Sequence, residues 1–317
     1  MHTADPHVES ESLAVEAVDV RHAYDDHVAL AGMSLRVPQG KIFALLGPNG
    51  SGKTTLFRLL ATLMPLQSGE LRVAGVGVAS VMEVRRRIGI VFQSPSLDKK
   101  LTVLENLRCQ AALYGIRGAL LRRRETEVLQ RLRLEDRKND FCEKLSGGLK
   151  RRVELAKGML HQPEVLLLDE PSTGLDPGAR LDLWEALNEF SKAGLSVVLT
   201  THLLEEAEKA DQIAILSEGK VIAQGAPDRL RSRMGAGLIT ITTEDPHAVC
   251  RRLREQLSLE GQALNNQVRL QSDHPGPLVS QLLDVLGDQA TSVSVGRPSL
   301  EDVFIAETGY QFWSGAS

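Results

Sequence analysis

The sequence predicts an α/β fold, in which a mixed sheet carries a ligand site where its strands end, and two observations support this. The first is the segment GPNGSGKTT, Gly47 to Thr55, which stands between the apolar segment Lys41–Leu46 and a segment with leucines at helical spacing, Thr54–Met64. The second is a pair of continuous apolar runs, Val165–Leu168 and Leu195–Thr200. Such runs are typical of parallel strands buried on both faces.

The first of these segments matches the phosphate-loop pattern of Gly, four residues, Gly, Lys and then Ser or Thr. Glycines let backbone N–H groups turn toward a polyanion, and the following helix presents the positive end of its dipole. Lys53 adds a charge for the outer phosphates, and the Thr54 hydroxyl suits a magnesium ion. A glycine-rich turn that binds nothing is disfavoured by the flanking strand and helix. The predicted phosphate-binding residues are Gly47, Pro48, Asn49, Gly50, Ser51, Gly52, Lys53, Thr54 and Thr55.

The composition is that of an ordinary globular protein, with 42% hydrophobic and 25% charged residues. The formal net charge of -4 gives no global electrostatic reason to expect a nucleic-acid partner. Basic clusters at Arg85–Arg87, Arg122–Arg124 and Lys150–Arg152 are interpreted as solvated helix faces. Three cysteines without metal-ligand spacing favour reduced thiols in a cytosolic compartment.

The sequence contains no run of about 18 apolar residues, the length that a helix needs to cross a bilayer. A role at a membrane would therefore require a partner. Residues 1–12 are polar and acidic, and they are predicted to be a flexible tail rather than a secretory signal.

Alternating residues from Leu13 to Val37 predict two or three antiparallel strands, broken by the polar turn Asp25–His27. Tyr24 stands just before this turn. A tyrosine at a strand end usually packs, yet its ring could also offer a flat face to a purine. Periodicity does not choose between these two roles.

A further buried strand, Arg87–Phe92, ends in Gln93, an amide placed to touch a ligand at the sheet edge. Thr102 and Glu105 then have the spacing of a capping box, which predicts a helix from about Val103. The sequence keeps a helical pattern to about Arg137, as expected for a helical insertion between strands.

The turn Ser146-Gly147-Gly148 leads into the next predicted helix. Small residues before a helix N-terminus make a second anion site physically reasonable. A plain helix start is the alternative, and it would be preferred if this turn stood alone.

The acids Asp169 and Glu170 follow the apolar run Val165–Leu168. Carboxylates at the end of a buried strand are costly to desolvate unless they meet a cation or a hydrogen-bonding network. Asp169 is suited to holding magnesium, and Glu170 to polarising water for attack on a terminal phosphate. His202 follows the next apolar run at the same predicted sheet edge, a position that favours phosphate contact over a structural role.

Taken in order, these features resemble the nucleotide-binding domain of an ATP-binding-cassette (ABC) transporter, a P-loop NTPase. The resemblance covers about Leu13 to Leu230, and the Ser-Gly-Gly turn before the acidic strand is specific to that family. Leu149 stands where many members have Gln, although apolar residues also occur there in exporter subfamilies. The features are the phosphate loop, Gln93, LSGGL (Leu145 to Leu149), VLLLDE (Val165 to Glu170), the turn Gly174-Leu175-Asp176 and His202.

The resemblance implies a role for each matching residue. Tyr24 would stack on adenine, and Thr54, Gln93 and Asp169 would serve magnesium. Glu170 would be the general base, with Lys53 and His202 as further catalytic residues at the γ-phosphate. A last group would reach ATP held by the opposite subunit of a head-to-tail dimer. This group comprises Ser146, Gly147, Gly148 and Asp176.

The implied organisation is an ABC-type ATPase domain over residues 13–230, with a helical subdomain at about 94–160. A small α+β accessory domain would follow over 231–317, built of alternating strands and helices. The closing segment PSLEDVFIAETG resembles the tail of exporter ATPases of the drug-resistance, nodulation and gliding type. The accessory domain carries no catalytic motif and is interpreted as a docking or dimer-stabilising module.

The implied function is an ATPase that uses ATP and Mg²⁺, pairs with itself and powers export through a separate integral-membrane permease. It would lie in the cytoplasm, at the inner face of the cell membrane. The alternative is a soluble ABC-type ATPase acting on nucleic acid or the ribosome. One cassette and no sustained heptads disfavour that alternative. A non-hydrolysing binding module is disfavoured because no catalytic position is replaced.

Overall fold

The computed structural model describes residues 12–235, 237–309 and 312. Contacts within the chain divide it into two compact units, Met1–Ile222 and Ala223–Ser317. The predicted flexible tail lies outside the described residues except for Ser12. The predicted end of the ATPase domain at residue 230 stays a prediction, and the division into units falls somewhat earlier, within the strand Lys220–Gly225.

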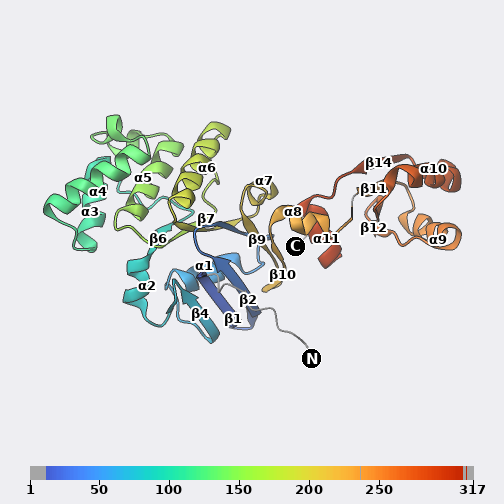
Figure 1. Ribbon diagram of the computed structural model, residues 1–317, viewed down its shortest axis with the longest axis horizontal. Coiled ribbons are helices and arrows are strands. Elements are labelled where there is room, and N and C mark those ends of the chain that lie inside the picture. Colours follow the sequence, from blue (N-terminus) through green and yellow to red (C-terminus); the bar gives the residue numbers. More distant parts are fainter. Residues whose placement is uncertain (1–11, 236, 310–311, 313–317) are drawn as a thin grey trace, which may run out of the picture. The chain divides into compact units, whose positions relative to one another are not determined.

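Two sheets organise the first unit (Figure 1). An antiparallel sheet has the order β2-β1-β4-β5, and a six-stranded sheet has the order β10-β9-β3-β8-β7-β6. In the second sheet β3 pairs in parallel with β8 and β9, and β7 pairs in parallel with β8 and β6. The strands are β1 (Leu13–Tyr24), β2 (His27–Pro38), β3 (Ile42–Leu46), β4 (Ser68–Val73), β5 (Val76–Gly77), β6 (Ile88–Val91), β7 (Val165–Asp169), β8 (Ser196–Thr201), β9 (Gln212–Ser217) and β10 (Lys220–Gly225).

Helices α3, α4 and α5 lie together at one end of this unit (Figure 1). Helix α3 begins at the predicted capping box, because Thr102 accepts from the Glu105 backbone N–H while the Glu105 carboxylate accepts from that of Thr102. The helices are α1 (Lys53–Leu60), α2 (Val81–Arg87), α3 (Val103–Leu113), α4 (Gly118–Arg131), α5 (Gly147–Met159), α6 (Pro177–Lys192) and α7 (Leu204–Ala207), with single 3₁₀ turns at η1 (Glu135–Arg137) and η2 (Cys142–Lys144).

The core of the unit lies between the antiparallel sheet, helix α1 and the central strands of the parallel sheet. Every side chain of β3 is buried, as expected of a strand that is covered on both faces. Phe43 and Leu45 of β3 share one cluster with Leu56 and Leu60 of α1. This packing fixes the start of α1 directly after the end of β3, where the phosphate loop lies.

One helix is shorter than the leucine spacing predicts. Helix α1 ends at Leu60, whereas the pattern places Leu63 on the same helical face. Thr62 adopts a left-handed backbone conformation with φ 56°, which stops the helix. Leu63 is consequently 51% exposed rather than part of the core.

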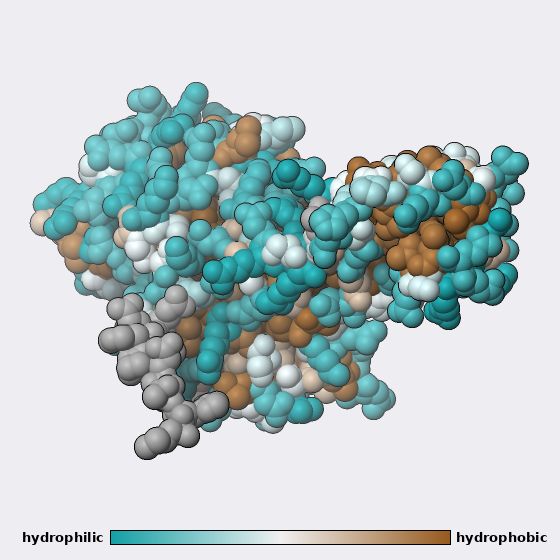
Figure 2. All heavy atoms as spheres, turned by 45° about the vertical axis from the view of Figure 1, so that its right-hand side comes forward, coloured by the Kyte–Doolittle hydropathy of each residue, from teal (hydrophilic) through white to brown (hydrophobic). Residues whose placement is uncertain are grey.

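The second unit is an antiparallel sheet of order β12-β13-β11-β14 with helices α9 and α10 packed on one face. The predicted alternation of strands and helices is confirmed, whereas the helices α8 and α11 and the strand β12 were not predicted. Hydrophobic residues reach the surface of this unit (Figure 2). Its elements are α8 (Pro227–Ser232), β11 (Gly237–Thr242), α9 (Pro246–Leu257), β12 (Gln262–Leu264), β13 (Gln267–Ser272), α10 (Pro275–Leu286), η3 (Gly287–Gln289), β14 (Ser292–Gly296) and α11 (Leu300–Thr308).

Within the described residues, no helix has both the length and the apolar character needed to cross a membrane.

Candidate functional site

The predicted phosphate loop connects the end of β3 to the start of α1. Gly52 is the N-cap of α1 and has φ 100°, a backbone conformation that only glycine adopts easily. A Cβ atom on Gly52 would lie 2.7 Å from the carbonyl oxygen of Ala29, and one on Gly47 would lie 2.6 Å from that of Leu216. Both glycines are therefore required for the path that the backbone takes here. This path leaves the backbone N–H groups in the first turn of α1 accessible to an anion.

The Lys53 side chain folds back over this loop. Its Nζ donates to the carbonyl oxygens of Gly47 at 2.7 Å and Pro48 at 2.8 Å, and the residue is only 4% exposed. Burial lowers the pKa of Lys53, while the carboxylates of Glu170 and Asp169 favour its charged form.

Ser51 supplies a test of whether a phosphate fits the loop. Its Oγ is buried and has no hydrogen-bond partner among the described residues, although most buried hydroxyls have one. A phosphate oxygen in the loop would accept from this hydroxyl and from the Lys53 ammonium. Thr54, in the first turn of α1, is exposed and so remains accessible to a cation beside such a phosphate.

The two predicted acids stand where β7 ends, and Thr200 of the neighbouring β8 connects them. Thr200 Oγ1 donates to Asp169 Oδ1 at 2.6 Å and accepts from the Glu170 backbone N–H at 2.9 Å. Burial raises the pKa of Asp169, whereas the Thr200 hydrogen bond and the Lys53 charge act in the opposite direction. Sequence reasoning missed Thr200, although a hydroxyl at the end of an apolar strand was a usable signal.

The Glu170 carboxylate lies at the centre of the predicted catalytic residues. Its Oε2 accepts from Gln93 Nε2 at 3.2 Å and from Thr173 Oγ1 at 3.2 Å. Its Oε1 lies 3.2 Å from His202 Nδ1. The backbone of Glu170 has φ 41°, a conformation that is rare outside glycine. The structure thus brings Gln93, Glu170 and His202 together from the ends of three parallel strands.

Tyr24 ends β1 and is 39% exposed, so its ring is accessible from solvent. Its hydroxyl contacts Met64 Sδ at 3.5 Å, and its ring meets His22 edge to face at 4.8 Å between centroids. Packing and purine contact therefore remain compatible with the same side chain.

The Ser146-Gly147-Gly148 turn and Asp176 form a second group. Ser146 caps α5 and accepts from the Leu149 N–H at 3.3 Å, and Asp176 caps α6 and accepts from the Ala179 N–H at 3.0 Å. The two helix starts pack closely, because a Cβ atom on Gly148 would lie 2.7 Å from the Ala179 Cβ. In the described part of the chain, no hydrogen bond joins this group to the phosphate loop.

A buried ion pair that sequence reasoning missed ties α5 to the segment after β6. Arg151 and Glu154 are 5% and 2% exposed and lie 3.0 Å apart. Arg151 donates to the carbonyl oxygens of Phe92 and Gln93, and Glu154 accepts from the Ser96 N–H at 2.7 Å. The interpretation of the basic cluster at Lys150–Arg152 as a solvated face was therefore wrong for Arg151. The run of three basic residues in the sequence does not reveal that Arg151 of α5 is buried.

No group of three or more His, Cys, Asp or Glu side chains gathers as a metal site among the residues that the structure describes. Magnesium in nucleotide sites is held by one or two protein ligands together with phosphate oxygens and water. Asp169, Gln93 and Thr54 supply oxygen ligands of the kind that this ion prefers, so the residues present fit it.

Comparison with known proteins gives two matching family models. The model described as "ABC transporter" matches residues 30–173. A second model, described as "AAA domain, putative AbiEii toxin, Type IV TA system", matches residues 144–208.

Similar proteins match along most of the chain. The daunorubicin resistance ATP-binding protein DrrA2 of Streptomyces coeruleorubidus is 37% identical over 94% of this chain and 96% of its own length. The Nod factor export ATP-binding protein I of Cupriavidus pinatubonensis is 36% identical over 93% of this chain and 90% of its own length. A solved structure, "Dimeric Structure of MJ0796, a Bacterial ABC Transporter Cassette", matches with a TM-score of 0.60 and 28% identity, covering 67% of this chain and 98% of that one.

Proposed function

Because the chain belongs to the family of ABC transporter ATP-binding proteins, which hydrolyse ATP, we propose that it powers export through a separate integral-membrane permease. The single observation that best supports this proposal is the Glu170 carboxylate, which is flanked by Gln93 and His202 and whose charge favours the charged form of the buried Lys53. The proposed location is the cytoplasm, at the inner face of the cell membrane, through the permease.

We assign the residues as follows. The phosphate loop Gly47–Thr55 holds the ATP phosphates, and Tyr24 offers its ring to the adenine. Glu170 accepts a proton from the attacking water, and Lys53 and His202 stabilise charge that develops on the γ-phosphate. Magnesium, when bound, neutralises phosphate charge. The residues that we assign to its shell are Thr54, Gln93 and Asp169.

The second group, Ser146 to Gly148 with Asp176, completes the site from another copy of the chain. The exposed helix N-terminus at Ser146 suits a phosphate, and no hydrogen bond of the described residues connects it to the phosphate loop of its own chain. The dimeric cassette cited above supports such a pairing. We propose that ATP closes the two chains and that hydrolysis reopens them.

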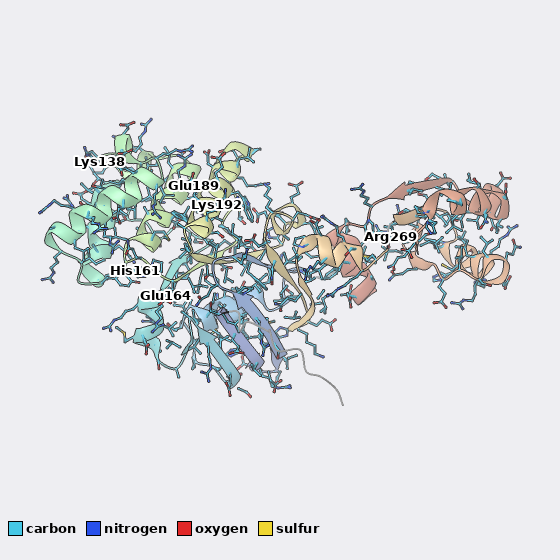
Figure 3. The ribbon with its side chains drawn as sticks, viewed as in Figure 1. Lys138, His161, Glu164, Glu189, Lys192 and Arg269 are labelled. Atoms are coloured by element: carbon cyan, nitrogen blue, oxygen red, sulfur yellow. The ribbon has the colours of Figure 1, made fainter. Side chains whose placement is uncertain are left out.

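A groove on the helical side of the first unit supports docking of the permease. The cavity of about 590 Å³ combines apolar side chains with three arginines, and no acidic residue lines it. Such a groove fits an amphipathic helix that carries acidic residues. Figure 3 labels one member, His161, whose ring stacks on Tyr114 at 3.9 Å. The lining residues are Met82, Arg85, Arg86, Gln110, Leu113, Tyr114, Ile116, Leu120, Arg124 and His161.

Copurification tests this proposal. The tagged chain, recovered from detergent-solubilised membranes, should bring down an integral-membrane protein. Leu113→Asp should abolish this while the ATPase activity of the isolated chain persists, because Leu113 is 81% exposed and is not one of the buried core residues. Lys192→Glu, at the exposed end of α6 (Figure 3), is the matched control and should copurify normally. Equal recovery of the membrane protein by both variants would contradict docking at this groove.

The alternative, an ATPase acting on nucleic acid or the ribosome, gains no support from the relatives cited above, whose names concern resistance and export. A strongly salt-dependent affinity for RNA would favour it.

A further inference from the structure

Strand β14 forms one edge of the sheet in the second unit and is left open there. Among the residues that the structure describes, it pairs with β11 alone, so within these residues the backbone groups on its other side have no strand beside them. Natural edge strands are usually protected by charged residues, proline or a bulge. Ser292–Gly296 contains no charged residue and no proline, and its pairing with β11 is regular from Leu238–Gly296 to Thr242–Ser292.

The opposite edge of the same sheet is protected. Strand β12 has only three residues, and Gln262 donates from Nε2 to the carbonyl oxygen of Ile305 in α11. The charged residue Glu260 stands just before this strand. The two edges of the sheet therefore differ in how they are protected.

Apolar side chains gather beside the open edge. Val295 of β14 is 49% exposed, and Leu283 of α10, the helix that packs against β14, is 50% exposed. Val279 lies one helical turn before Leu283 and so shares its face, and Val293 lies on the same side of the sheet as Val295. Isolated exposed apolar residues need no explanation, but a cluster along an unpaired strand does.

We propose that β14 pairs antiparallel with the β14 of a second copy of this chain, about a two-fold axis at Ser294. This register uses all five residues of the strand, placing Ser292 opposite Gly296 and Val293 opposite Val295 of the second copy. The two helix-covered faces then lie on one side, so the exposed Leu283 side chains of the two α10 helices approach each other. A surface that complements itself in this way is expected of a two-fold interface.

The charges at the two ends of the strand agree with this arrangement. Asp288 precedes β14 and Arg297 follows it, and both are exposed with no ion pair in the described part of the chain. Antiparallel pairing places the arginine end of each strand beside the aspartate end of the other. A parallel arrangement would instead bring like charges together.

Cysteine cross-linking tests the register on the full chain with Cys109→Ser, which removes the exposed native thiol. Ser294→Cys should form an intermolecular disulfide without nucleotide, because residues directly opposite have Cβ atoms about 5 Å apart. Ser292→Cys is the matched control, since its own counterpart would lie about 13 Å away along the strands. Equal cross-linking of the two variants, or none in either, would overturn the proposed pairing.

Sedimentation of the nucleotide-free chain tests the interface independently of the catalytic site. The wild type should dimerise, and Val295→Lys and Leu283→Lys should each weaken this association about tenfold or more. Gln256→Lys, on the exposed surface of α9, should leave it unchanged. A nucleotide-free wild type that stays monomeric at every concentration would refute the proposal. Because the ATP-driven pairing uses other residues, Val295→Lys should still dimerise with ATP in a Glu170→Gln background.

Discussion

Thr200 determines how the two acids at the end of β7 are presented, because its single hydroxyl binds both residues. It donates to the Asp169 carboxylate and accepts from the Glu170 backbone N–H. Glu170 can then hold its left-handed conformation and direct its side chain toward Gln93 and His202. The positions of the acids therefore depend on a residue of the neighbouring strand.

Thr200→Val should lower the ATPase kcat about 10- to 100-fold, as loss of a hydrogen bond behind a ligand usually does. It should also move the acidic limb of the pH profile to higher pH. The reason is that the hydroxyl stabilises the charged carboxylate, so its loss raises the pKa of Asp169 further above its ordinary value. Thr200→Ser keeps the hydroxyl and is the control. An unchanged acidic limb in the valine variant would show that Thr200 does not influence the pKa of Asp169.

Glu170→Gln should retain ATP binding and lose turnover by about 10²- to 10⁴-fold, because the amide cannot accept a proton from water. The amide keeps the size of the side chain, so Gln93 and Thr173 retain a neighbour. With hydrolysis blocked, ATP should accumulate a dimer that size-exclusion chromatography detects. Undiminished ATP hydrolysis by this variant would show that Glu170 is not the general base.

At the scale of elements, helix α5 both presents a helix N-terminus and, through its buried Arg151–Glu154 pair, holds the segment after β6. Its N-terminus presents Ser146, and its Arg151 and Glu154 hold the segment from Phe92 to Ser96. We therefore expect a movement of Gln93 to be passed to the helix start that we assign to the opposite nucleotide. Burial raises the pKa of Glu154 and lowers that of Arg151, so each charge depends on the other.

Glu154→Leu should cost about 3–5 kcal/mol of unfolding free energy, because it leaves the Arg151 charge buried and unpaired. Arg151→Met combined with Glu154→Leu should recover much of this loss, since two apolar residues can replace a buried pair. The ATPase activity of the double variant should stay low, because the segment after Gln93 has lost its anchors. Urea unfolding and turnover measure the two effects separately, and a double variant with normal turnover would limit the pair to a structural role.

The elements predicted from sequence are those with strong local signals. The apolar runs gave β7 and β8, and the capping box gave the start of α3. Helix α11 was not predicted, although Ser299 and Asp302 form a capping box at its start. The end of α1 was missed because nothing in the local pattern marks Thr62 as left-handed.

The site was predictable only in part, for a related reason. Gln93, Asp169 and His202 stand at or just after the ends of apolar strands, so their common sheet edge can be predicted from the sequence. The roles of Thr200 and of the Arg151–Glu154 pair depend on which strands and helices become neighbours. Such contacts join residues far apart in the chain, and local patterns do not contain them.

At the scale of the whole molecule, we propose that each ATP site is built from two copies of the chain. Lys53 and Glu170 would stand on one side of the site, and Ser146 to Gly148 of another copy would stand on the other. Gly147→Asp is a suitable probe of the second side. Among the described residues, a Cβ atom at this position would meet only Leu175, at 3.8 Å, and an acid in the first turn suits a helix N-terminus. The variant should therefore fold, while its charge repels the γ-phosphate.

The most direct measurement is the ATPase activity of Lys53→Ala and Gly147→Asp, alone and mixed in equal amounts. Each variant alone should be inactive, because both sites of its dimer contain the lesion. In a mixed dimer one site combines the intact Lys53 side with the intact Gly147 side, so about a quarter of the wild-type activity should return. A mixture as inactive as its components would contradict a site shared between two chains.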